Sequence, residues 1–538
     1  MNLKRRGFFG AAAGLAALGC AGTQEKEAAA EKEAAVKPFE FDEATIGELR
    51  AAMQSGRCTA RYITGKYLTR IEEIDRQGPK INSVIELNPE AEQIAEALDA
   101  ERKAGRLRGP LHGVPVLIKD NIGTADKMST SAGSLALDGS TPAQDSGVAA
   151  KLRQAGAVIL GKTNLSEWAN FRSSQSTSGW SGRGGLTLNP YALDRNACGS
   201  SSGSGAAAAA SLCAVAVGTE TDGSIIGPSS VNCLVGLKPT VGLVSRSGII
   251  PISHTQDTAG PMTRTVADLA LLLGAIAGPD PRDPATSGSQ GKALTDYTQF
   301  LDPGGLKGAR IGVPRKFCGF SDALDKIFNG LLEEMKRQGA EIIDPAEMPE
   351  GKDGGSEYLG MLYEFKADLN LYLEALGPGA PVHSIKEIIE FNESHRELEM
   401  PYFGQDIMVK AEAKGPLTTP EYLENREKVL RGAREQGIDK LMDELKLDAI
   451  LAPSGGPPSV NDLVNGDHYP GGSSGPAAAA GYPNLNVPAG FIFGLPFGIS
   501  FFGRAWSEPV LIRIAYAFEQ ATKVRKPPRF LPTADLSV

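Results

Sequence analysis

CGSSSGSGAAAAASLCAVAVGTETDGSIIGP, residues 198–228, contains two serine-bearing turns with regular elements between them. A Gly/Ser loop over 198–205 runs into an alanine-rich segment, 206–212, whose composition predicts a helix. The apolar run 213–217 predicts a buried strand, and a second polar turn follows it at 219–224. A helix and a strand between the turns would hold the hydroxyls of Ser200 and Ser224 at a fixed separation. The stretch therefore indicates a rigid platform for hydroxyl chemistry.

A lysine at the end of another apolar run is the candidate base. Hydroxyls are poor nucleophiles until a base takes their proton, and none of the five histidines lies in either serine turn. In GVPVLIKDN, residues 113–121, the run 116–118 leads directly to Lys119. Burial disfavours the ammonium form and lowers the lysine pKa from about 10.4. A lysine with a pKa of roughly 7–8 can act as a general base near neutral pH.

These three motifs resemble those of the amidase signature family of serine amidohydrolases. The resemblance rests on Lys119 in GVPVLIKDN, Ser200 in CGSSSGS and Ser224 in TETDGSI. It implies that Ser224 is the acylated nucleophile, that Ser200 relays the proton from a cis peptide, and that neutral Lys119 is the final base. It also implies an oxyanion hole, with no metal and no organic cofactor. The hole would consist of the backbone N–H groups of Thr221, Asp222, Gly223 and Ser224.

The resemblance covers residues 43–522 and implies one large α/β unit. The expected fold is a large mixed, mostly parallel twisted sheet with helices on both faces. Strands and helices alternate over 114–161, which favours the same class. A Thr45–Glu48 capping box predicts a helix over 45–56. Two further helices are predicted, one after Thr59 and one after Asn88. We also expect a helix-rich insertion at 350–447 and a C-terminal tail at 523–538.

The first 20 residues have the pattern of an export signal. A basic segment at 4–6 precedes the short apolar run 10–19, which is below the roughly 20 residues that a spanning helix needs. RRGFF at 5–9 resembles a twin-arginine motif, and ALGC at 17–20 resembles a lipobox in which Cys20 is lipidated. Ala17 departs from the usual lipobox. The pattern predicts a periplasmic or cell-envelope lipoprotein of a bacterium, tethered by residues 21–42. An uncleaved amphipathic leader is the alternative.

Composition excludes several classes of function. The net charge is −9, and no basic stripe is present that would bind nucleic acid. The six cysteines form neither a CxxC motif nor a Cys/His cluster, so no metal site is predicted. We expect most of them to be buried thiols. The only membrane contact expected is the N-terminal lipid, and the oligomeric state is left open.

Several segments are closest in motif to bacterial peptide amidases, which remove the C-terminal amide of peptides. Those segments are TETDGSI, CGSSSGSG, GKTNLSEWANFR and SGWSGRGG. Many family members carry Arg where Ile226 stands here. A carboxylate-bearing substrate would lose that partner, which favours neutral or peptidic amides. Asn170, Phe171 and Trp180 are candidates to line the substrate cleft, with packing in the core or in loops as the alternative for each. The role of the Asp222 carboxylate is left open.

Four other functions are alternatives. A general aliphatic or aryl amidase of the same family is the main alternative to a peptide amidase. An amidotransferase component that delivers ammonia to aminoacyl-tRNA would share the triad, but the export pattern argues against it. A non-catalytic surface lipoprotein would have no reason to keep the triad residues. A Ser-His-Asp hydrolase would need a G-x-S-x-G elbow, and neither serine sits in one. The substrate expected is therefore a small amide or a short amidated peptide.

Overall fold

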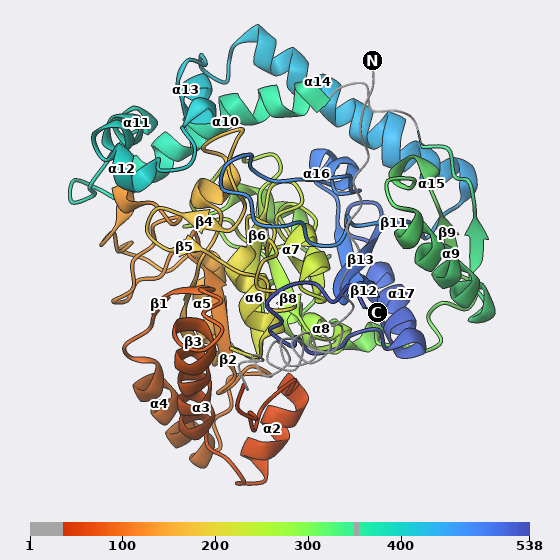
Figure 1. Cartoon of the computed structure of the whole chain (residues 1–538), viewed down its shortest axis with the longest axis horizontal. Coiled ribbons are helices and arrows are strands. Elements are labelled where there is room, and N and C mark those ends of the chain that lie inside the picture. Colours follow the sequence, from red (N-terminus) through yellow and green to blue (C-terminus); the bar gives the residue numbers. More distant parts are fainter. Residues whose placement is uncertain (1–35, 349–353, 538) are drawn as a thin grey trace, which may run out of the picture. The chain divides into compact units, whose positions relative to one another are not determined.

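An eleven-stranded mixed sheet organises the described chain, residues 36–348 and 354–537 of a computed structural model (Figure 1). Its order is β1-β3-β2-β6-β8-β7-β12-β13-β11-β9-β10. The strands are β1 (Val84–Leu87), β2 (Pro115–Lys119), β3 (Val158–Thr163), β6 (Val215–Glu220), β7 (Val235–Lys238), β8 (Thr258–Thr263), β9 (Arg310–Gly312), β10 (Glu341–Ile343), β11 (Ala449–Pro453), β12 (Asn484–Ile492) and β13 (Leu495–Phe502). A separate two-stranded sheet pairs β4 (Trp180–Ser181) with β5 (Gly185–Leu186).

The predicted large mixed α/β sheet is confirmed, although parallel pairing is less extensive than the sequence predicted. Parallel pairs occur in two groups, β3-β2-β6 and β11-β9-β10. The six other neighbouring pairs are antiparallel. Every residue of β2, β6 and β8 is buried. Because successive side chains of a strand point to opposite faces, protein covers both faces of the sheet there.

Helices pack on the sheet and extend beyond it. At the sheet centre, α6 contacts β6 and α7, while α8 and α17 contact each other. The helices of the first part of the chain are α2 (Ile46–Gln54), α3 (Ala60–Ile71), α4 (Ala91–Lys103), α5 (Gly147–Gln154), α6 (Ser202–Ala209), α7 (Ile226–Val231), α8 (Val266–Ile276) and α9 (Asp322–Arg337). Those that follow are α10 (Gly354–Ala375), α11 (Ile385–Ser394), α12 (Arg396–Glu399), α13 (Asp406–Glu412), α14 (Pro420–Ala433), α15 (Asp439–Leu445), α16 (Gly475–Ala480) and α17 (Glu508–Thr522).

The first helices begin where local signals place them, with one exception. Thr45 and Glu48 form the predicted capping box of α2, and the Thr59 side chain caps α3. By contrast, α4 begins at Ala91, because the Asn88 side chain accepts from the backbone of Glu90 and closes a turn before the helix. An asparagine that bonds two residues onward makes such a turn instead of an N-cap.

The helices α10 to α15 occupy the predicted helix-rich region (Figure 1). Of these, α10, α11 and α13 share a hydrophobic cluster with loops of the main body, in which Phe365 and Leu369 of α10 meet Trp168, Phe171 and Ile250. This cluster seats the insertion beside the loops that follow β3 and precede β8. The insertion therefore forms part of the surroundings of the candidate site.

The two chain ends differ in what the structure describes. Residues 36–37 are the only described part preceding the compact unit that begins at Pro38, so Cys20 and the proposed leader lie outside the described residues. The predicted C-terminal tail is packed against the body, since Arg525 is ion-paired with Glu43 and bonded to the Cys233 carbonyl. Within the described residues, no helix combines the length and hydropathy needed to cross a membrane.

All five described cysteines are free thiols. Cys58, Cys213 and Cys233 are buried, while Cys198 and Cys318 are partly exposed. The prediction that most would be buried is confirmed for this part of the chain. They pack as small apolar side chains.

Candidate active site

Lys119 and Ser200 are in direct contact. Lys119 is the last residue of β2, and its Nζ donates to the Ser200 Oγ at 2.7 Å. It also donates to the Thr219 Oγ1 at 2.9 Å and to the Thr219 carbonyl at 3.3 Å. Both Lys119 and Ser200 are fully buried, and the peptide bond between Gly199 and Ser200 is cis. The lysine therefore has three oxygen acceptors and no solvent.

Burial changes the protonation of this lysine. Loss of solvent around the ammonium lowers the pKa of Lys119 from 10.5 to about 7, and the charges of Asp257 and Glu220 oppose that fall. A base with this pKa is about half neutral at neutral pH. The arrangement can thus accept a proton from Ser200 under ordinary conditions.

Ser224 lies on the turn that follows β6. It is 8% exposed, and its carbonyl accepts from the Ser201 N–H at 3.2 Å, which ties the two serine turns together. The Glu220 carboxylate accepts from the N–H groups of Ile225 and Ile226 at 2.6 and 2.9 Å and fixes the chain after the serine. Gly223 has φ of +75°, in the left-handed region that favours glycine.

The backbone N–H groups of this turn are available as donors. Within the described part of the chain, those of residues 221–224 donate to no protein acceptor. Unpaired N–H groups next to a nucleophile can stabilise an oxyanion in the transition state. The four N–H groups of this turn are therefore candidates for an oxyanion hole.

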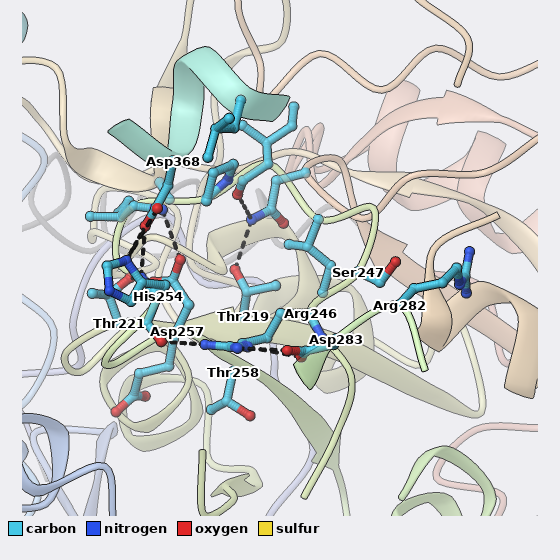
Figure 2. A pocket seen from close by; sticks show the side chains of 18 residues that line it. Thr219, Thr221, Arg246, Ser247, His254, Asp257, Thr258, Arg282, Asp283 and Asp368 are labelled. Atoms are coloured by element: carbon cyan, nitrogen blue, oxygen red, sulfur yellow. Dashed lines mark hydrogen bonds and ion pairs between the residues drawn. The ribbon is translucent and has the colours of Figure 1, made fainter. Parts of the chain in front are cut away.

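Asp257 connects this turn to the loop before β8. The Thr221 hydroxyl donates to one carboxylate oxygen at 2.5 Å, and the N–H groups of Ile252 and Ser253 donate to the other (Figure 2). Enclosure by protein raises the pKa of Asp257 to about 6. The carboxylate thus holds the 252–257 loop and also the first residue of the candidate oxyanion turn.

A cavity of about 740 Å³ opens onto both serine turns. Gly199, Gly223 and Ile226 line it on the side of the serines, and Asn170 and Phe171 line it as well. Protein sites for small ligands commonly have volumes of roughly 300–1,000 Å³. The cavity therefore has the size for a peptide-sized substrate beside Ser224.

Trp180 is not among the residues that line this cavity, although it was a candidate to do so. It is 6% exposed and packs edge-on against Phe403 and Tyr402, with ring centroids 5.1 and 5.6 Å apart. The Arg172 guanidinium lies 5.1 Å from its ring. An aromatic ring placed beside a buried arginine and two other rings is occupied by packing, and we assign Trp180 to this core.

A smaller cavity of about 230 Å³ reaches Thr219 and Asn121 (Figure 2). The Asn121 amide donates to the Thr219 hydroxyl at 3.0 Å, so that hydroxyl accepts from Asn121 and Lys119 together. Sequence reasoning missed both residues. Thr219 is 100 residues from Lys119 in the chain, and no local pattern marks the contact.

One group of side chains could be taken for a metal site. The nearest ligand atoms of His254, Glu364 and Asp368 lie within 4.8 Å of one another. His254 is bonded to Asp368 at 2.9 Å, and Glu364 accepts from the Tyr422 hydroxyl at 2.7 Å. The backbone N–H of Thr255 also donates to Glu364, at 3.3 Å. These carboxylates therefore already serve to attach the 253–255 loop to α10.

The chain belongs to the Amidase family, whose profile matches residues 63–512. It is an amidase of the amidase signature class. It is 44% identical over 504 residues to a probable amidase of Arabidopsis thaliana, covering 92% of this chain and 93% of that protein. A component of the glutamyl-tRNA(Gln) amidotransferase of Halorhodospira halophila is 32% identical, with 90% and 98% covered.

Solved structures of peptide amidases are also similar to this chain. The native peptide amidase from Stenotrophomonas maltophilia is 50% identical, with a TM-score of 0.87, covering 92% of this chain and 100% of that one. A peptide amidase in complex with the competitive inhibitor chymostatin has a TM-score of 0.89, with 91% and 100% covered. The expected amidase signature fold is thereby confirmed.

The expectation of an exported bacterial lipoprotein is wrong. The relatives matched over most of the chain include a plant amidase and a fungal relative, from Arthroderma benhamiae, that also carries an amidase name and is 38% identical over 494 residues. The prediction rested on short basic and apolar runs within residues 4–19, which lie outside the described residues.

Proposed function

We propose that this amidase hydrolyses the C-terminal amide of peptides and releases ammonia through an acyl-enzyme on Ser224. The similarity to peptide amidases supports this substrate class. The cavity of about 740 Å³ beside the serine turns offers space for the acyl part of a short peptide. The assignment of individual catalytic residues is part of the proposal.

The observation that carries it is the 2.7 Å contact of a largely desolvated lysine with Ser200. In the first step, the Ser224 hydroxyl attacks the amide carbonyl and gives its proton to Ser200, while Ser200 gives its own proton to neutral Lys119. The carbonyl oxygen becomes negative and is stabilised by the N–H groups of residues 221–224. The proton then returns to the amide nitrogen, the C–N bond breaks and ammonia leaves.

The second step restores the enzyme. Water attacks the acyl-enzyme carbonyl, gives its proton to Lys119 through Ser200, and displaces Ser224. The proton returns to the Ser224 oxygen, and the products of the two steps are a carboxylic acid and ammonia. Every proton that the lysine accepts is thus given back within the same half-reaction.

Ammonia release from an amidated dipeptide, a simple aliphatic amide and an anilide tests this proposal. We expect the dipeptide amide to have the highest kcat/KM, and Ser224→Ala to abolish turnover of all three. Ser287→Ala, which changes an exposed serine on a surface turn, is the matched control. Turnover of only the simple amides would point to a general amidase. Activity that survives in Ser224→Ala would overturn the nucleophile assignment.

A further inference from the structure

The charged side chains of the substrate cavity are unevenly distributed in sign. Among the described residues that line it, two are acidic, Asp222 and Asp467, and one is a histidine, His468. None of these lining residues is Lys or Arg. Both aspartates are exposed to the cavity. A substrate that enters therefore meets two carboxylates and no fixed cation.

The two carboxylates come from different segments and face the same space. Asp222 belongs to the turn of Ser224, and a hydrogen bond with Ser474 orients it. Asp467 belongs to the loop between β11 and α16, and the Ser178 N–H donates to its carboxylate oxygens at 3.0 Å. Asn196 donates to the same carboxylate at 3.3 Å. Each acid is thus held in place, one on the turn of the nucleophile and one on the loop between β11 and α16.

Both carboxylates are exposed, yet the surrounding protein shifts their pKa values. Although they remain accessible, the surrounding protein raises the pKa of Asp222 and of Asp467, while their hydrogen bonds to Ser474 and Ser178 act in the opposite direction. The pKa of Glu357, in the neighbouring helix α10, rises to about 8 through burial and the charge of Asp222. A cation that enters replaces lost water around these groups, whereas an anion adds repulsion.

We infer that Asp222 and Asp467 make this cavity select acyl groups that carry a positive charge over neutral ones, and neutral ones over acyl groups that carry a carboxylate. The inference rests on the proposed function, since it names the substrate class of the same site. A unit charge about 6–8 Å from one carboxylate, in a site of intermediate polarity, changes binding by about five- to tenfold. We expect this factor between successive members of a charge series.

The test uses three matched peptide amides and three matched simple amides, with ammonia release as the readout. The peptides are the N-acetyl dipeptide amides of Lys-Phe, norleucine-Phe and Glu-Phe. The simple amides are 6-aminohexanamide, hexanamide and adipic acid monoamide. The assay at pH 8 keeps the amine of the lysine substrates charged. Within each series, kcat/KM is expected to fall about five- to tenfold from cation to neutral and again from neutral to anion.

Variants connect the preference to the two carboxylates. Asp222→Asn and Asp467→Asn are each expected to reduce the cation-to-neutral ratio by at least threefold, whatever they do to absolute rates. Glu424→Gln, an exposed acid on α14 that does not line the cavity, makes the same change in net charge and should keep the wild-type ratio.

The outcomes separate this inference from the proposed function. If the peptide amides are hydrolysed but their kcat/KM values differ by less than twofold, the charge preference is overturned and the peptide amidase assignment stands. If only the simple amides react, and in the expected order, the preference stands and the peptide assignment fails. Wild-type ratios in both aspartate variants, or no turnover in either series, overturn the inference.

Discussion

The titration of Lys119 determines the expected pH dependence of this amidase. The fall of its pKa from 10.5 to about 7 means that the buried site disfavours the charged form, relative to the neutral one, by about 5 kcal/mol. At pH 7 about half of the lysine is then neutral, against roughly 3 in 10,000 at the ordinary value. Burial therefore raises the fraction of competent base by about a thousandfold.

The expected profile follows from this value. With a neutral amide substrate, kcat/KM should fall tenfold per pH unit below about pH 7 and level off above about pH 8, as initial rates of ammonia release between pH 5 and 9 would show. A kcat/KM that is constant over this range, or one that still rises tenfold per pH unit up to pH 9, would refute the role of Lys119 as the base.

Asp257 is the group that could be confused with Lys119, since its pKa is raised to about 6 and its charge raises that of the lysine. The variant Asp257→Asn distinguishes the two. If Lys119 is responsible, the fall of kcat/KM at acid pH remains in the variant and moves to lower pH, because a neighbouring negative charge is gone. If the fall reports the titration of Asp257, it disappears in the variant.

Two further predictions concern the attachment of the helical insertion. Arg172→Leu should lower the free energy of unfolding by about 3–5 kcal/mol in chemical denaturation, because it removes the partner of buried Glu167, which accepts from Arg172 at 2.6 Å. The control Arg431→Leu, at an exposed position, should change the free energy of unfolding by less than about 0.5 kcal/mol. Equal losses in the two variants would contradict the assignment. Burial lowers the pKa of His254, but the Asp368 hydrogen bond and the nearby carboxylates raise it overall. Its ion pair with α10 should therefore be intact below about pH 6.5 and weaken as the pH rises through the raised value. The hydrogen-exchange protection factors of α10, which remove the intrinsic rise of amide exchange with pH, should fall over that range in the wild type and stay constant in His254→Gln. An identical response in both would exclude the ion pair as the cause.

Features that depend on near neighbours in the chain could be predicted from the sequence. The Thr45–Glu48 capping box needs only two residues three positions apart, and it is present as expected. The strand that ends at Lys119 follows from an apolar run, and its burial explains the lowered pKa. The start of α4 could not be placed, because whether the Asn88 side chain caps a helix or closes a turn depends on one rotamer.

Contacts between distant segments were decided only by the tertiary structure. The order of the sheet places β2 beside β6, and this neighbourhood brings Lys119 to Ser200 and Thr219, which are 81 and 100 residues away. Long sequence separation also explains why the sequence could not decide between cleft and core for Trp180, since its partners Tyr402 and Phe403 come from the insertion. The sequence by itself determined which residue types stand at strand ends and turns, because short-range sterics and hydrogen bonds act along the chain. Strand order and the seating of the insertion determined which of them meet, because those depend on burial of apolar surface summed over the whole fold.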